Sequence, residues 1–140
     1  MSIRDAATKR MLMATFVAIA SMWLLSYLAS FIGVSGAGRA SSSMGHLDPV
    51  NLLVTAIAMC LGGYIEGKRF IGIALAIICV LWVITVYVLL QIAKPAQPDA
   101  LPHILSYNRV QIAFSVLAAC AGAAIGAWLR MRRAALRAAA

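Results

Sequence analysis

The chain has 140 residues, of which 64% are hydrophobic and 11% are charged, and its formal net charge at pH 7 is +8. The apolar residues are concentrated in long uninterrupted stretches, which is typical of an integral membrane protein. The basic residues lie in the short segments that flank these stretches, with no soluble domain to present a basic face, so we expect no nucleic-acid partner.

Three of the apolar stretches are long enough to cross a bilayer on length alone. Met11 to Val34, Phe70 to Ala93 and Val110 to Leu129 contain no Asp, Glu, Lys or Arg. Each reaches the roughly 20 residues that a helix needs to cross about 30 Å of hydrocarbon. They are predicted to be transmembrane helices.

A fourth stretch, Val50 to Ile65, is shorter but carries helix signals at both ends. Asp48 and Pro49 predict an N-cap followed by a proline in the first turn of a helix. Gly67 can end that helix in the left-handed conformation, and Lys68 can extend its side chain to the membrane surface. This segment is therefore also predicted to span the membrane.

The four spans predict the fold class. Inside a bilayer every backbone N–H and C=O group needs an internal partner, and a chain with so few alternating segments can satisfy these groups only with helices. We therefore predict an all-α, four-helix transmembrane bundle. It forms a single integral membrane domain over residues 1–140, with spans at about 11–34, 49–67, 70–93 and 105–130.

Lys and Arg residues are distributed unevenly between the two sides of the predicted bundle. Most of them precede the first span, join the second to the third or follow the fourth, whereas the other side has only Arg39, Lys94 and Arg109. Basic residues in short loops stay in the cytoplasm, so both termini are predicted to be cytoplasmic. The excess of Arg over Lys and the abundance of Ala favour a bacterial inner membrane, with an organelle membrane as the alternative.

The end of the chain is predicted to bind anionic lipid. Arginines recur after the last span at helical spacing among alanines. The last helix should therefore continue into the headgroup layer, where its arginines contact anionic lipids. Docking to a cytoplasmic partner is the competing interpretation. The candidate headgroup ligands are Arg130, Arg132, Arg133 and Arg137.

An internal repeat of two-helix hairpins is predicted from the match between residues 50–65 and 110–125. Each unit would hold two helices, so both copies would have the same orientation in the membrane, as in the parallel repeats of some transporters. Chance alignment of small apolar residues is the alternative. The matched pairs include Asn51 with Gln111, Thr55 with Ser115, Ala58 with Ala118, Cys60 with Cys120 and Gly62 with Gly122.

Small residues at a spacing of four predict where the helices pack. Membrane helices associate closely where small side chains let their backbones approach. The second and fourth helices are therefore expected to cross at the centre of the bundle. The residues predicted to form this contact are Ala58, Gly62, Ala118, Gly122 and Gly126.

Few polar residues could carry chemistry. Glu66 is the acidic residue closest to the predicted hydrocarbon layer, and an intramembrane carboxylate is a candidate proton or ion site. Its neighbours Lys68 and Arg69 favour the alternative of an ion pair at headgroup level. Four loop residues have side chains of the kind that bind transition metals, although their spacing matches no known motif. These weak metal candidates are His46, Asp48, Asp99 and His103.

The sequence contains no catalytic, cofactor-binding or nucleotide-binding motif, so we expect neither an enzyme nor a bound cofactor. The small number of polar residues inside the spans favours a non-catalytic subunit or assembly factor of a larger membrane complex, in contact with other membrane subunits or with copies of itself. The alternative is a homo-oligomeric transporter or channel, which the parallel repeat and Glu66 would suit. The first span lacks the carboxylate that small multidrug exporters carry there. A lipid-modifying enzyme is a distant third interpretation.

Overall fold

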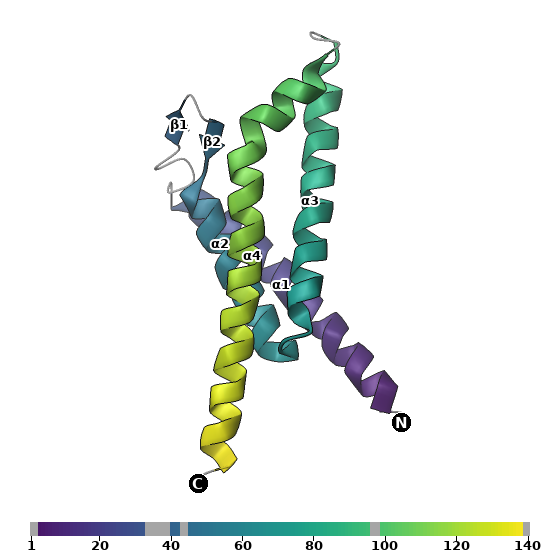
Figure 1. Cartoon of the computed structure of the whole chain (residues 1–140), viewed down its shortest axis with the longest axis vertical. Helices are drawn as coiled ribbons and strands as arrows, with labels where there is room; N and C mark the ends of the chain where they lie inside the picture. The colour runs from purple at the N-terminus through teal and green to yellow at the C-terminus, as the bar shows by residue number, and fades with distance from the viewer. Residues whose placement is uncertain (1–2, 33–39, 43–44, 96–98, 139–140) are drawn as a thin grey trace.

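The computed structural model describes residues 3–32, 40–42, 45–95 and 99–138. Within these ranges the chain forms four helices and one short two-stranded hairpin (Figure 1). The two strands follow the first helix in the chain, precede the second, and pair antiparallel. The elements are α1 (Ile3–Phe31), β1 (Ala40–Ser42), β2 (Gly45–Leu47), α2 (Pro49–Glu66), α3 (Phe70–Ala93) and α4 (Ala100–Ala138).

All four described helices are long and apolar enough to cross a membrane, which confirms the prediction of four helices of this kind. Two helices extend beyond their predicted spans, since α1 begins at Ile3 and α4 continues to Ala138. The 39 residues of α4 measure about 58 Å, nearly twice the thickness of the hydrocarbon layer. Ala and Arg are strong helix formers, so the helix continues outside the bilayer. Residues 33–34 of the first predicted span lie outside the described ranges.

The helices are arranged around a central pair. α2 and α4 run in the same direction and pack against each other more extensively than any other pair (Figure 1). α1 packs mainly on α2, and α3 packs mainly on α4, whereas α1 and α3 barely touch. α1 runs obliquely across the other helices, and its beginning lies at the same end of the molecule as the end of α4.

Both ends of α2 are fixed by the residues that the sequence indicated. Asp48 is the N-cap, and its carboxylate accepts a hydrogen bond from the Asn51 N–H at 3.2 Å. Pro49 follows in the first turn, where a missing N–H costs nothing. Gly67 has φ +91°, which favours glycine, and its N–H donates to the Gly63 carbonyl at 2.7 Å. The turn into α3 is therefore short.

Glycines bring the backbones of α2 and α4 into direct contact. A Cβ atom placed on Gly122 would overlap the carbonyl oxygen of Ala56, and one on Gly126 would overlap that of Cys60. In the same way, a Cβ on Gly63 would overlap the carbonyl oxygen of Ala123. Larger side chains at these positions would force the helices apart.

The residues predicted to pack the helices take different positions in the structure. Gly122 lies in the contact between α2 and α4, as does Gly126, whereas Gly62 lies against the ring of Phe70. Gly63 occupies the place on α2 that was assigned to Gly62, because Ala56, Cys60 and residue 63 share one helical face. The remaining candidates are Ala58, which is fully buried, and Ala118, which is half-buried.

Enlarging a contact glycine should destabilise the bundle. We expect Gly126→Ala to lower the free energy of unfolding by about 1–3 kcal/mol, as overpacking does elsewhere. Gly72 on α3 is a matched control, because a Cβ there would meet no atom within 4 Å. Gly72→Ala should be neutral or stabilise by up to about 1 kcal/mol. Unfolding in mixed micelles with increasing SDS measures the free energy of unfolding of both variants. Equal changes in the two variants would contradict this packing.

Candidate functional site

Polar side chains from three helices gather in one pocket between the helices, with a volume of about 210 Å³. Met22 of α1 and two apolar residues of α3, Ile78 and Leu81, complete its wall, so all four helices contribute. None of the described residues that line it is charged. The polar residues of this interhelical pocket are Asn51, Thr55, Trp82, Thr85, Gln111 and Ser115.

The pocket lies in the half of the bundle away from the termini. Along α4, Gln111 and Ser115 lie about 29 Å and about 22 Å from Arg130, at 1.5 Å of rise per residue. Since Arg130 is at the end of the apolar stretch and hydrocarbon is about 30 Å thick, these residues belong to the opposite half of the layer. Polar groups at this depth need partners within the protein.

A hydrogen bond between α3 and α4 forms one wall of the pocket. The indole Nε1–H of Trp82 donates to Ser115 Oγ at 2.7 Å, and that hydroxyl donates to the carbonyl of Ile112 at 2.9 Å. A buried indole needs an acceptor, and the hydroxyl of Ser115 provides it. Ser115 itself is buried at 4% exposure.

Gln111 joins the start of α2 to α4. Its Oε1 accepts a hydrogen bond from the backbone N–H of Asp48 at 2.8 Å. Because an N–H only donates, the amide oxygen of Gln111, and not its nitrogen, faces Asp48. Gln111 is 4% exposed, and its Nε2 has no acceptor among the described residues. Since Gln111 lines the pocket, this amide group is a hydrogen-bond donor available there.

The two threonines of the pocket are acceptors. The hydroxyl of Thr55 donates to the carbonyl of Asn51 at 2.8 Å, and that of Thr85 donates to the carbonyl of Leu81 at 2.8 Å. Each hydroxyl has one proton, which these bonds use, and two lone pairs. The pocket therefore offers donors from side-chain amides and acceptors from hydroxyl oxygens.

Sequence reasoning did not identify this pocket, although a signal for it was present. Asn51 and Thr55 of α2 are the residues that the predicted repeat matches with Gln111 and Ser115 of α4. All four line the pocket because α2 and α4 lie side by side and run in the same direction. Matched polar residues in two parallel helices are therefore the pattern that could have revealed it.

At the other end of the bundle, arginines of α4 contact α2. Arg130 Nη1 donates to the carbonyl of Ile65 at 2.8 Å, and Arg133 donates to the hydroxyl of Tyr64. The last carbonyls of a helix have no partner within it, so Arg130 satisfies a group that would otherwise lack one. These residues were predicted to bind lipid headgroups, and Arg130 and Arg133 have protein partners as well.

The two remaining candidate headgroup ligands are exposed. Arg132 lies over the ring of Trp128, with its guanidinium carbon 5.4 Å from the ring centroid. Arg137 lies in the last turn of α4. Both side chains are on the surface and can reach the headgroup layer.

Glu66 lies at the end of α2 with part of its carboxylate buried. Its Oε2 has no hydrogen-bond partner among the described residues. Lys68 and Arg69, which were expected to pair with it, are both exposed, and no ion pair between them and Glu66 is found within the described part of the chain. A buried oxygen without a partner is unfavourable, so this carboxylate is a candidate for an interaction outside the chain.

The four weak metal candidates do not form a cluster in the part of the chain that the structure describes. Asp48 caps α2, while Asp99 and His103 are exposed near the start of α4. The side chain of His46 lies outside the description. No group of three His, Cys, Asp or Glu side chains that could hold a metal ion is found among the described residues.

Comparison with known proteins gives no relative. No family model matches the chain, and neither a curated protein nor a solved structure matches it. The function has to be argued from the geometry alone.

The bond between Trp82 and Ser115 should couple α3 energetically to α4. In a double-mutant cycle of Trp82→Phe and Ser115→Ala, we expect a coupling energy of about 0.6 kcal/mol, and at most about 1.7 kcal/mol, as for other hydrogen bonds in membranes. A control cycle pairs Trp82→Phe with Thr55→Val, which lines the same pocket without bonding the indole. Similar couplings in both cycles would show that the hydrogen bond contributes nothing specific.

Proposed function

We propose that this chain is a non-catalytic subunit or assembly factor of a larger membrane complex. The observation that carries this proposal is the closed centre of the bundle. The backbones of α2 and α4 touch at Gly63, Gly122 and Gly126, in the half that contains the termini. A solute path along this pair would have to separate them, which supports a packing role over transport through a single chain.

An aromatic face on α1 is the proposed contact with a partner helix. Phe16, Trp23, Tyr27 and Phe31 recur at helical spacing along α1, and each is at least 69% exposed. Aromatic side chains dominate the energetics of protein interfaces, and such a stripe suits a neighbouring membrane helix. α1 is also the helix that makes few contacts beyond α2, so this face is free within the described chain.

The proposed location is a bacterial inner membrane with both termini in the cytoplasm. The beginning of α1 and the end of α4 lie at the same end of the molecule (Figure 1). That end also contains the basic turn between α2 and α3, with Lys68 and Arg69. The positive-inside rule supports this orientation, and the arginines that follow the last span suit anionic lipids.

We also propose that the two hairpins, α1 with α2 and α3 with α4, are copies of one ancestral unit. Each hairpin packs internally, while α2 and α3 make few contacts. Gly63 lies against Ala123, which is its counterpart in the repeat. The shared direction of α2 and α4 is what a parallel repeat requires.

The second candidate is a homo-oligomeric transporter or channel. The observations that favour it are the interhelical pocket and the buried Glu66 oxygen, which has no partner among the described residues. Intramembrane carboxylates commonly bind protons or ions, and a path could form between copies of the chain instead of through one copy.

Native mass spectrometry of the protein, extracted gently from its own membrane, tests the proposed function. We expect a stoichiometric complex with at least one different membrane subunit. Phe16→Leu combined with Tyr27→Leu should reduce the recovered complex about fivefold, because losing a central interface contact costs more than about 1 kcal/mol. Phe114→Leu on α4, which removes an exposed aromatic ring elsewhere, is the matched control and should leave the complex intact.

A complex built only of copies of this chain would contradict the subunit proposal. In that case ion flux into vesicles that contain the protein decides the second candidate. Glu66→Gln should then abolish flux, because the amide keeps the shape of the side chain but cannot exchange a proton. Flux that survives this change would exclude Glu66 as the coupling residue.

A further inference from the structure

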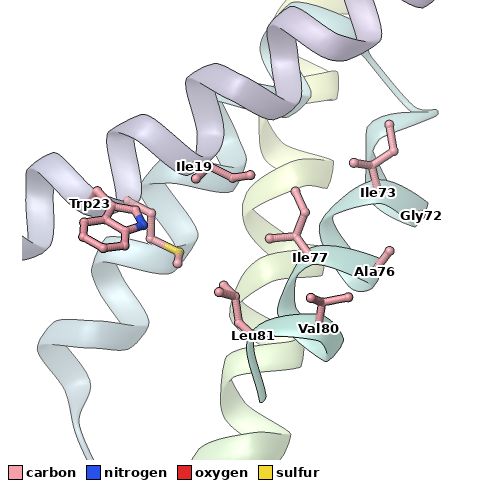
Figure 2. Close-up of a pocket in the computed structure, with 9 residues that line it drawn as sticks. Ile19, Trp23, Gly72, Ile73, Ala76, Ile77, Val80 and Leu81 are labelled. Carbon is pink, nitrogen blue, oxygen red and sulfur yellow. The ribbon is translucent and has the colours of Figure 1, made fainter. Parts of the chain in front are cut away.

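An apolar groove between α1 and α3 adjoins the interhelical pocket. It has a volume of about 420 Å³ and is lined by Ile19 and Trp23 of α1 and by Gly72, Ala76 and Val80 of α3, among others (Figure 2). The groove exists because α1 and α3 barely touch. At Gly72 a Cβ atom would meet nothing within 4 Å, so α3 presents bare backbone there.

Met22 and Leu81 line both the groove and the interhelical pocket, so the two spaces are neighbours separated by these side chains. Met22 is unbranched and flexible, and it can change rotamer at low cost. A single molecule can therefore place a polar group in the pocket and an apolar tail in the groove.

The lining of the pocket indicates the charge of that polar group. Among the described residues that line it, none is charged. Burying an ion without a counter-charge costs far more free energy than burying a neutral polar group that forms hydrogen bonds. The group that fits the pocket is therefore neutral.

The hydrogen-bonding pattern indicates its chemistry. Gln111 Nε2 is a donor without an acceptor among the described residues, and Gln111 is 96% buried, being 4% exposed. Thr55 and Thr85 have used their protons and can only accept. A hydroxyl group both donates and accepts, so it can bond to the amide and to a threonine at the same time.

We propose that the interhelical pocket binds a neutral amphiphile with a hydroxyl head, such as a long-chain alcohol or a lipid with a free hydroxyl, whose apolar tail lies in the groove between α1 and α3. The amide of Gln111 donates to the hydroxyl oxygen, and Thr85 accepts the hydroxyl proton. This site goes beyond the proposed role as a subunit, because it does not depend on a protein partner.

Trp82 provides the reporter for a test. Its indole forms the wall of the pocket and bonds to Ser115, so its emission responds to a molecule that enters. We would use the full chain with Trp128→Phe, which keeps Trp23 in the groove, reconstituted in lipid nanodiscs, and titrate 1-dodecanol, dodecyl methyl ether and dodecane. Dodecanol should shift the tryptophan emission saturably, and the contribution of Trp82 is the difference from the same protein with Trp82→Phe. The ether, which cannot donate, should bind about fivefold more weakly, and dodecane should give no saturable shift.

Variants locate the hydroxyl within the pocket. Gln111→Met keeps the length of the side chain and a weak acceptor for the Asp48 N–H but removes the amide donors, and it should weaken dodecanol binding about fivefold or more. Thr85→Val should weaken dodecanol binding by a similar factor. This change removes only a hydroxyl that bonds within α3, so no contact between helices is lost. Thr15→Val is the matched control, since the hydroxyl of Thr15 bonds in the same way to Met11 but lies outside the pocket.

Three results would overturn the proposal. The first is a shift that rises without saturation, because it reports only partition into the bilayer. The second is equal binding by the Thr85→Val and Thr15→Val proteins, which would place the hydroxyl elsewhere even if Gln111→Met fails to fold. The third is saturation by 1-butanol at the same concentrations as dodecanol, which would show that no tail is bound in the groove.

Discussion

The fold depends on the direct contact between the backbones of α2 and α4. Lipid tails are as apolar as the side chains of the helices, so no hydrophobic force brings membrane helices together. Close packing has to do so, and the glycines at positions 63, 122 and 126 permit it. The outer helices attach to this pair through small or buried residues, such as Ala14 and Ala18 of α1 and Ala74 of α3. A change in the separation of α2 and α4 would therefore alter every other contact.

The same central pair explains the interhelical pocket. Towards the termini glycines of each helix lie against backbone atoms of the other, and the contact is closed. Towards the other end α2 and α4 contribute the polar residues Asn51, Thr55, Gln111 and Ser115 to the pocket. The bonds from the Asp48 N–H to Gln111 and from Trp82 to Ser115 connect α4 to the start of α2 and to α3 without filling this space. The bundle therefore combines a closed packing core with a polar space at one end. This combination is the basis for proposing a component that binds neighbours in the membrane over one that conducts solutes by itself.

Local signals in the sequence predicted the helices, while the contacts between them were only partly predictable. Asp48, Pro49 and Gly67 determine the ends of α2 through bonds to near neighbours, so they could be identified from spacing. The contact glycine of α2 was assigned one residue too early, because the sequence does not give the rotation of a helix about its axis. The partner of Arg130 and the acceptor for Trp82 lie on other helices, far away in the chain. Such pairs follow from the crossing of the helices, which spacing within one segment does not determine.

Solid-state NMR in lipid bilayers measures the central contact most directly. The protein would carry ¹³C at cysteine carbonyls and glycine α-carbons, diluted in unlabelled protein so that contacts within one chain dominate. The packing of Gly126 against the carbonyl of Cys60 predicts a through-space correlation between these two residues, which Cys60→Ser should remove. A spectrum with correlations only between near neighbours of the same helix would contradict the close α2–α4 contact.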